Sequence, residues 1–491
     1  MRSLSRVLLV GITTAAVLAG GQVGAEASGL FPQPGAHGGG ERLYPGLGNG
    51  GYDVLSYDVS YKFDSGTPLM PAAVSIVARA DQSLSSFSLD AVARKISSVS
   101  VNGLPANFVL DKTKEKLVID PKLPLLKGLP FRVGIDFVAD RSLSPKAPNF
   151  GHQDNLPHWV NGSDGFWLLG QPDRAHLFFP MNDVPRDKAR VTFRINVPRD
   201  RQAVASGLLK SKVTSGNRTT YVYSTRDPIP TDVVEVGVGR LTEIDGVGPH
   251  GLPLRSFVSS SQAAAARRRV GLIPGQLRWV EKKIGAPYPF ETYGVLGEDA
   301  DVGIALEGAT LTSIGASYLA KPSVKGVAVM VHELVHQYFG NAVSVRSWDD
   351  MWISEGHASY YGSLWSAEQG DDPIEEFLRK AYDYDSGDRP LYGPPGRPAD
   401  TIAVLGGTNA GGALMLYGLN RTVGDKTFTN IERTFFQRYR NRSATTQNYI
   451  DVVNQVTGKD FTKYIRSWIY GKTTPMVPGH PELGHSALRS H

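Results

Sequence analysis

Cysteine is absent from the 491 residues of the sequence. Its absence excludes a disulfide framework, thiol catalysis and any metal site with cysteine ligands. After the N-terminal residues no apolar run is long enough to span a bilayer, so we predict no integral membrane span in the mature chain. The formal net charge is only +5, and the one dense basic cluster, Arg267–Arg269, has no aromatic residues between its charges. We therefore predict no nucleic-acid partner.

The N-terminus has the pattern of a cleaved signal peptide. Two arginines, Arg2 and Arg6, precede an apolar run that ends in small residues. The alternative is an uncleaved membrane anchor, but the glycines at 20–21 interrupt the apolar run. We predict that residues 1–27 are a signal peptide and that the protein is secreted. A large secreted chain without cysteine is more typical of bacteria than of eukaryotes.

The rest of the chain, with 41% hydrophobic and 20% charged residues, has the composition of a globular protein with two or three domains. Residues 28–51 are rich in glycine and proline and have little apolar content, so we predict a linker. From residue 52 to 245 several segments alternate apolar and polar residues, as in 57–63, where four aromatic or β-branched residues share one face. This period of two predicts an antiparallel β domain.

The composition changes after residue 245. Apolar residues then recur at helical spacing over most of the chain, with a few short strands near residues 293–315. We predict a mixed α/β lobe over 246–355, a helical lobe over 356–475 and a flexible tail over 476–491. The fold class is therefore α+β with several domains.

Residues 332–336 read "HELVH", and this motif predicts a metal site. Because a helix advances by about 100° per residue, His332 and His336 project from one face and can bind the same ion. Glu355, after eighteen more residues, is the candidate third ligand. Two imidazoles and one carboxylate leave a coordination position open, which is typical of catalytic zinc. We predict one Zn2+ per chain, although two ordinary histidines remain the alternative interpretation.

Glu333 lies about 100° around the helix from His332, so we expect it beside the metal and not among its ligands. There it can take a proton from the attacking water, whose pKa the metal lowers. Glu333 is therefore the candidate catalytic base of a hydrolase.

These residues resemble the gluzincin aminopeptidases, the family of aminopeptidase N. That family has the same two histidines, glutamate and spacing, and "WLNEGFA" around its third ligand where this chain has "WISEGHA". The stretches "HQYFGN" and "PYPFETYG" agree as well. The similarity runs from about Tyr44 to Tyr470 and corresponds to a short exported form without the large C-terminal helical domain. It implies that the β domain is followed by a thermolysin-like zincin catalytic domain with a helical C-terminal lobe.

The resemblance also implies a site for the free amino group of a peptide. The family binds this group with a glutamate in a Gly-Ala-Met-Glu-Asn segment, and here "GIALEGATL" retains Glu307 but has Gly308 in place of the asparagine. Gln171 matches a residue of the β domain that helps to hold the amine, although it could equally be an ordinary polar loop residue. The implied partners are peptides with a free N-terminus.

Two departures from the family pattern bear on activity. The family has a tyrosine that donates a hydrogen bond to the developing oxyanion, and the alignment places Asn409 at that position. Tyr392 or Tyr417 could substitute, although neither is in the expected register. His357 stands where the family usually has an aromatic residue, and could either hydrogen-bond near the metal or pack, of which packing is favoured.

The leading prediction is an exported zinc metallo-aminopeptidase that hydrolyses N-terminal residues from peptides through a zinc-activated water. The first alternative is a catalytically weakened or inactive zinc-containing member that binds peptides, because Asn409 replaces the expected tyrosine. The second alternative is an endopeptidase with the same zinc chemistry. The sequence leaves open the preferred N-terminal residue, the natural substrate and the oligomeric state.

Overall fold

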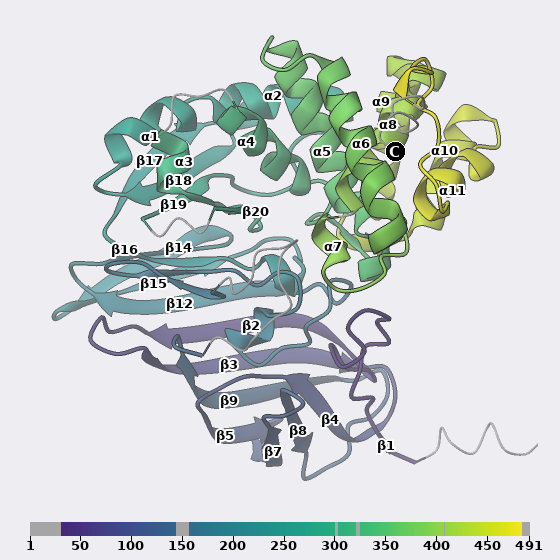
Figure 1. The fold of residues 1–491 in the computed structure, drawn as a ribbon. Coiled ribbons are helices and arrows are strands. Elements are labelled where there is room, and N and C mark those ends of the chain that lie inside the picture. Colours follow the sequence, from purple (N-terminus) through teal and green to yellow (C-terminus); the bar gives the residue numbers. More distant parts are fainter. Residues whose placement is uncertain (1–30, 144–156, 300–302, 321–324, 407, 484–491) are drawn as a thin grey trace, which may run out of the picture.

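The computed structural model describes residues 31–143, 157–299, 303–320, 325–406 and 408–483. The predicted signal peptide lies outside the described residues. Within them the chain forms a β-rich N-terminal half and a mainly helical C-terminal half, which pack against each other (Figure 1). No described helix is long and apolar enough to cross a membrane.

An eight-stranded sheet is the centre of the β domain. Its strands, in spatial order, are β14 (Leu208–Ser215), β15 (Arg218–Ser224), β12 (Arg190–Pro198), β2 (Tyr52–Lys62), β3 (Leu69–Ala80), β9 (Pro130–Asp140), β5 (Lys95–Val101) and β6 (Leu104–Pro105). All neighbours are antiparallel except β2 and β12, which are parallel. The alternation predicted for 57–63 is confirmed, since Tyr57, Val59 and Tyr61 are buried and the residues between them are partly exposed.

Two four-stranded sheets complete the β domain. The first contains β1 (Gln33–Pro34), β4 (Leu84–Asp90), β8 (Lys116–Asp120) and β7 (Asn107–Asp111). The second contains β10 (Trp159–Asn161), β11 (Phe166–Leu168), β16 (Val236–Gly239) and β13 (Gln202–Ala205). The 3-10 turn η3 (Thr231–Val233) leads into β16 and faces the C-terminal half, where the hydrogen bond from Ala309 N to Val233 O is 2.8 Å long.

The C-terminal half, which contains the predicted catalytic domain and is called the catalytic half below, begins with a five-stranded sheet. It contains β17 (Leu241–Val247), β18 (Pro253–Ser259), β19 (Val295–Glu298), β21 (Thr312–Gly315) and β20 (Ala305–Leu306). The helices α1 (Ala263–Val270), α2 (Ile273–Ile284), α3 (Ala316–Ala320) and α4 (Lys325–His336) accompany it (Figure 1). The boundary predicted at 245/246 falls inside β17, whose ladder with β18 places the whole strand in the five-stranded sheet.

The helical lobe follows α4 along the chain. Its helices are α5 (Trp352–Glu368), α6 (Ile374–Tyr392), α7 (Ala403–Gly406), α8 (Thr408–Val423), α9 (Asp425–Tyr439), α10 (Thr446–Thr457) and α11 (Thr462–Tyr470). A two-stranded ladder of β22 (Val343–Val345) and β23 (Arg442–Ala444) joins the segment after α4 to the segment after α9. The core of this lobe is α8, which packs against α5 and carries buried Leu414, Met415 and Leu416.

Residues 31–51, which the sequence predicts to be a linker, pack against both halves of the molecule. Tyr44 meets Trp348 edge-on with ring centroids 5.7 Å apart, and both rings are buried. The buried carboxylate of Glu41 accepts a 2.8 Å hydrogen bond from the Ser347 hydroxyl. The linker prediction fails here because polar contacts and the buried ring of Tyr44 together hold a segment of low apolar content in place.

The described part of the predicted flexible tail also packs. Val477 and Leu483 are buried, and His480 Nε2 lies 3.0 Å from the Tyr417 hydroxyl on α8. Residues 476–483 are therefore held against the helical lobe, and the rest of the predicted tail lies outside the described residues.

Candidate active site

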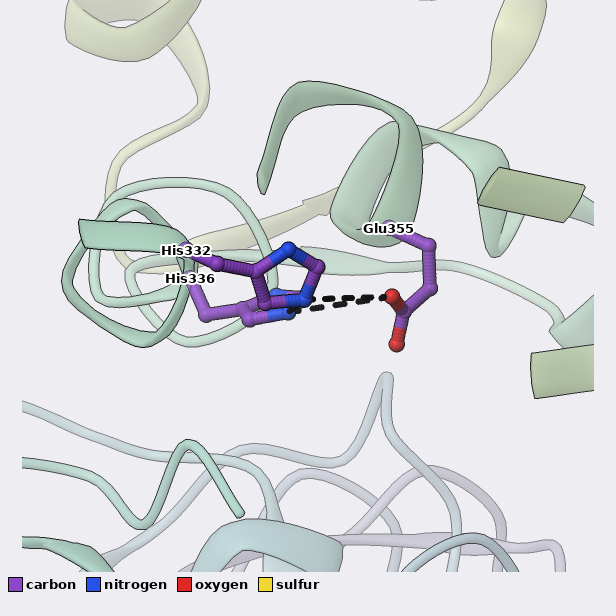
Figure 2. Close-up of side chains that lie close together, drawn as sticks. All are labelled: His332, His336 and Glu355. Atoms are coloured by element: carbon purple, nitrogen blue, oxygen red, sulfur yellow. Dashed lines mark hydrogen bonds and ion pairs between the residues drawn. The ribbon is translucent and has the colours of Figure 1, made fainter. Parts of the chain in front are cut away.

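The "HELVH" motif occupies the last turns of α4, as the spacing predicts. His332 and His336 lie on one face of the helix with their Nε2 atoms 3.0 Å apart (Figure 2). Met330, Val331 and Leu334 on the rest of the helix are buried and anchor it in the catalytic half. The helix therefore presents both imidazoles to one point.

Glu355 reaches the same point from the first turn of α5 (Figure 2). Its Oε2 lies 3.6 Å from His332 Nε2 and 3.8 Å from His336 Nε2. The donor atoms of the three residues all lie within 4.8 Å of one another, close enough to hold a single ion. The structure thus brings together the three ligands that the sequence predicts.

Ser354, beside Glu355, orients His336. The Ser354 hydroxyl lies 2.8 Å from His336 Nδ1 and 3.2 Å from the Phe339 carbonyl oxygen, to which it donates. Such a contact fixes the ring so that the opposite nitrogen, Nε2, points at the ion. Sequence reasoning missed Ser354, because a serine has no signal of its own before its partner is placed.

The donor set suits zinc. Burial lowers the pKa of His336 to about 3, so this imidazole is neutral and free to bind a metal. Burial also lowers the pKa of His332, but its hydrogen bond with Glu355 and the neighbouring carboxylates Glu333 and Glu307 outweigh burial and raise it to about 9. An environment that attracts a proton so strongly also attracts a divalent cation, and two histidines with one carboxylate leave a position open for catalysis.

Glu333 is on α4, outside the cluster of His332, His336 and Glu355, although it forms a second group with Glu307 and His336 whose donor atoms also lie within 4.8 Å of one another. It is 5% exposed, and its Oε2 has no hydrogen-bond partner among the described residues. Burial, which the charge of His332 opposes, raises the pKa of Glu333 to about 8. With His332 it lines a cavity of about 400 Å³ between α4, α5 and α6. A carboxylate with an unoccupied oxygen and a raised pKa is suited to accept a proton near neutral pH.

Glu307 and Gln171 meet across the boundary between the two halves. Gln171 of the β domain donates through Nε2 to Glu307 Oε1 at 2.8 Å, and both side chains are buried. Glu307 Oε1 lies 3.8 Å from His336 Nδ1, so this contact is next to the ligand cluster. Burial raises the pKa of Glu307, which favours a cationic partner at this end of the site.

The residue after Glu307 has no side chain for a steric reason. A Cβ at Gly308 would lie 2.4 Å from the Leu311 carbonyl oxygen and 3.0 Å from the Glu235 Cβ. Glu235 is fully buried and accepts a 2.6 Å hydrogen bond from the Ser313 hydroxyl. The glutamate therefore occupies the space beside residue 308, and the departure from the family's asparagine is part of the packing.

The segment that follows α4 holds the backbone of Glu307. Asn341 Nδ2 and Gln337 Nε2 both donate to the Glu307 carbonyl oxygen, at 2.6 and 3.2 Å. The Asn341 and Ala342 carbonyls in turn accept 2.7 Å hydrogen bonds from Lys188 Nζ of the β domain. Burial lowers the pKa of Lys188 to about 7. These residues escape prediction because each is an unremarkable polar residue until the two domains are placed together.

The remaining candidates are not part of the ligand cluster of His332, His336 and Glu355. Asn409 is in the first turn of α8, about one turn before Gly412, whose Cα is 2.9 Å from where a Cβ would be on Gly356. The i, i+3 relation therefore places Asn409 on the face of α8 that packs against α5. The Tyr417 hydroxyl contacts the C-terminal segment instead, and Tyr392 is the last residue of α6.

His357 packs, which is the alternative that the sequence favours. Its ring stacks on Phe339 with centroids 4.2 Å apart, and its Nδ1 lies 2.7 Å from the Ile353 carbonyl oxygen. Its Nε2 is 3.1 Å from Glu432 Oε2, and both side chains are fully buried. His357 thus belongs to the core behind α5.

A β domain packed on a catalytic half, with two histidines and a glutamate on one helix and a third ligand on another, defines the class of gluzincin metallopeptidases. The chain belongs to peptidase family M1: residues 270–468 match the model of the peptidase family M1 domain, and residues 54–233 match that of the peptidase M1 N-terminal domain.

Among curated relatives, glutamyl aminopeptidase of Rattus norvegicus is 23% identical over 327 residues, which are 62% of this chain and 34% of the relative. Aminopeptidase N of Oryctolagus cuniculus is 28% identical over 199 residues, 38% of this chain and 21% of the relative. The chain thus spans about a third, or less, of the length of these two relatives.

Solved structures match over more of their length. An M1 zinc metallopeptidase from Deinococcus radiodurans has a TM-score of 0.78 at 28% identity, covering 89% of this chain and 99% of that chain. A mutant of that enzyme bound to a Tyr-Ser-Ala substrate has a TM-score of 0.77 at the same identity and coverage. The short two-part architecture is therefore shared with a known metallopeptidase.

Proposed function

We propose that the protein is an exported zinc aminopeptidase that removes N-terminal residues from peptides. The observation that carries this proposal is the buried contact between Gln171 and Glu307 beside the metal ligands. A carboxylate placed there can bind a cationic N-terminus one residue away from the bond that is cut, which makes cleavage exopeptidic. The tripeptide bound by the Deinococcus relative supports peptides as the substrate class.

In this proposal, separate residues bind the metal, transfer the proton and anchor the substrate. His332, His336 and Glu355 would hold zinc, which supplies Lewis acidity for the peptide carbonyl and for the attacking water. Glu333 accepts a proton from that water and passes it to the leaving amine, for which its unpartnered Oε2 and raised pKa suit it. Glu307 anchors the ammonium group of the substrate and keeps the scissile carbonyl in register.

A catalytically weakened member is the second candidate, and Asn409 is the observation that favours it. An asparagine amide can donate to the developing oxyanion, but it reaches less far than a phenol. Loss of one oxyanion donor typically lowers turnover by about 100- to 1000-fold. The protein would then bind zinc and free-amine peptides but turn them over slowly.

The test is to measure zinc content and turnover of a panel of aminoacyl anilides, with Glu333→Ala and with N-acetylated substrates. We expect one zinc per chain, turnover lowered at least about 100-fold in Glu333→Ala with zinc retained, and no turnover of blocked substrates. Bound zinc without turnover of any anilide or unblocked peptide would refute the aminopeptidase and support the weakened member. Cleavage of quenched peptides that are blocked at the N-terminus would support an endopeptidase.

Export rests on residues 1–27, whose charge and hydropathy pattern supports cleavage near the end of the apolar run. We expect the full-length chain, expressed in a bacterium with a general secretion pathway, to reach the medium or periplasm without these residues. Intact-mass measurement of the recovered protein tests this, and a chain that keeps its first residues inside the cell would contradict it.

A further inference from the structure

Asp232 is a second carboxylate beside the amine anchor. It is the middle residue of η3, the turn that also receives the hydrogen bond from Ala309 N, two residues after Glu307. Asp232 is 5% exposed. The turn therefore presents a buried acid to the Glu307 segment.

The amide of Gln171 lies between the two acids. Its Nε2 is 2.8 Å from Glu307 Oε1 and 3.4 Å from Asp232 Oδ2. An ionised carboxylate can only accept hydrogen bonds, and an amide nitrogen has two hydrogens to donate. Both hydrogens thus have an acceptor, and the amide oxygen is turned to the opposite side. When the two acids are ionised, the amide nitrogen is the end that faces them.

The second oxygen of Asp232 is also available. Asp232 Oδ1 is buried and has no hydrogen-bond partner among the described residues. Lys188, whose ammonium senses the charge of Asp232, donates instead to the carbonyls of Asn341 and Ala342. The carboxylate is therefore not neutralised by a direct ion pair in the described part of the chain.

We propose that Asp232 is a positioning residue of the amine site, which fixes the amide of Gln171 with its oxygen toward the substrate. The ligand class is the primary ammonium group of a peptide or amino acid derivative. Glu307 and the Gln171 oxygen then both accept from the ammonium, and Asp232 acts through Gln171. This inference rests on the proposed aminopeptidase function.

The test compares two ligands that differ only in the amino group. They are the hydroxamate of the amino acid preferred in the anilide panel and the same hydroxamate without its α-amino group. Calorimetry on the zinc-loaded protein measures both affinities. Because both ligands bind the metal through the same hydroxamate group, that contribution cancels in the ratio of the two affinities. For Asp232→Asn we expect the affinity ratio to fall about tenfold, because the hydrogen bond that Gln171 donates to residue 232 loses its charged acceptor. For the anilide, KM should rise about tenfold and kcat should change less than about threefold.

Asp187→Asn is the matched control. It makes the same change from acid to amide at a buried position of the β domain, where the side chain accepts hydrogen bonds from Val54 N and Asn182 Nδ2 and not from Gln171. We expect the affinity ratio to stay within about twofold of the original protein. A tenfold loss in this variant as well would overturn the specific role of Asp232.

A double-mutant cycle with Gln171→Ala tests whether Asp232 acts through Gln171. In the Gln171→Ala background, Asp232→Asn should no longer change the ratio, because the intermediary is gone. Additive effects would overturn the positioning role. If Asp232→Asn does not fold, Asp232→Ser in the same cycle gives the same readout.

The outcomes separate this inference from the proposed function. If the unmodified protein binds the two hydroxamates with equal affinity, this result contradicts the amine site itself and with it the aminopeptidase function. An original protein that distinguishes them, with an unchanged ratio in Asp232→Asn, contradicts only the role of Asp232.

Discussion

At the level of single residues, the packing beside Glu307 requires a glycine at position 308. Gly308 stands where the family pattern has asparagine, and Glu235 and the Leu311 carbonyl fill the space that a side chain would need. A change toward the family pattern at this position should therefore harm the protein and not improve it. A local departure from a family is best judged together with the neighbour that accommodates it.

We expect Gly308→Asn to lower thermal stability and to raise KM for anilides, because the new Cβ would push the Glu307 segment away from Gln171. Overpacking of this kind costs about 1 to 3 kcal/mol. Differential scanning calorimetry and steady-state kinetics measure both effects. Gly66→Asn is the control, because no atom lies within 4 Å of a Cβ at Gly66. An unchanged Gly308→Asn protein would contradict the steric explanation.

Glu235→Gln should change how stability depends on pH. Burial raises the pKa of Glu235 from 4.5 to about 8, so the folded state keeps a proton that the unfolded state loses. This contribution to stability is present below about pH 4.5 and is lost as the pH rises toward 8. The variant lacks it, so its stability relative to the original protein should increase between pH 5 and 8, by about 3 kcal/mol. Urea denaturation at several pH values measures the difference, and a constant difference would contradict the prediction.

The cluster of His332, His336 and Glu355, with Glu333 beside it, could be predicted from sequence, because helix geometry converts spacing into direction. The contacts of Asp232 with Gln171 and of Ser354 with His336 could not, because each joins side chains that are distant in the sequence. Glu307 and Gln171 came from family resemblance, since nothing in their own spacing predicts a contact across two domains.

At the level of secondary structure, α5 connects the metal site to the core. Its first turn carries Glu355 and Ser354 toward the metal site, and the same turn begins the packing of His357 against Phe339 and Glu432. Gly356 allows α8 to approach closely at Gly412. The position of the third ligand is thus fixed by contacts on the opposite face of the helix.

Ser354→Ala should weaken zinc binding about 10- to 100-fold, as is typical when the partner of a ligand histidine is lost. His336 would still face the site, but its ring would be free to rotate. Competition with a zinc chelator followed by metal analysis measures the affinity. Ser344→Ala is the control, since that buried hydroxyl has no hydrogen-bond partner in the described residues. Equal affinities for the two variants would contradict the role of Ser354.

The elements with clear periodicity, such as β2, β9, β12 and α4, could be predicted from sequence. The packing of residues 31–51 could not, because that segment is held by polar contacts to residues some 300 positions away, as between Glu41 and Ser347. Hydrophobic patterning does not report such contacts. The domain boundary predicted within β17 is wrong for a related reason, because the sequence of a strand does not show which sheet the strand joins.

At the level of the whole molecule, the two halves are joined by buried polar contacts as well as by the chain. Lys188 of the β domain binds the segment after α4, and Gln171 binds Glu307. Residues 31–51 add the Glu41 contact to Ser347 and the meeting of Tyr44 with Trp348. Gln171 and Glu307 therefore meet at the interface, and neither half alone brings them together.

Lys188→Met should lower the free energy of unfolding by about 2 to 3 kcal/mol, because the carbonyls of Asn341 and Ala342 lose a buried donor. It should also raise KM for anilides, since Asn341 positions the backbone of Glu307. Chemical denaturation and kinetics measure the two effects. Lys210→Met on the exposed strand β14 is the control and should be neutral. A stable Lys188→Met protein with normal KM would contradict the prediction.

The contact between Gln171 and Glu307 has a consequence for thermodynamic linkage. A ligand that binds both residues at once is held by two domains, and it therefore acts as a reversible cross-link between them. Its binding free energy adds to the cohesion of the domain pair and raises the temperature at which they separate. A ligand without an amino group would bind the metal but could not form this cross-link. The protein with the cross-linking ligand bound would thus resist heat and proteases better than the ligand-free protein. The difference in resistance would increase with the affinity for the amino group of the ligand.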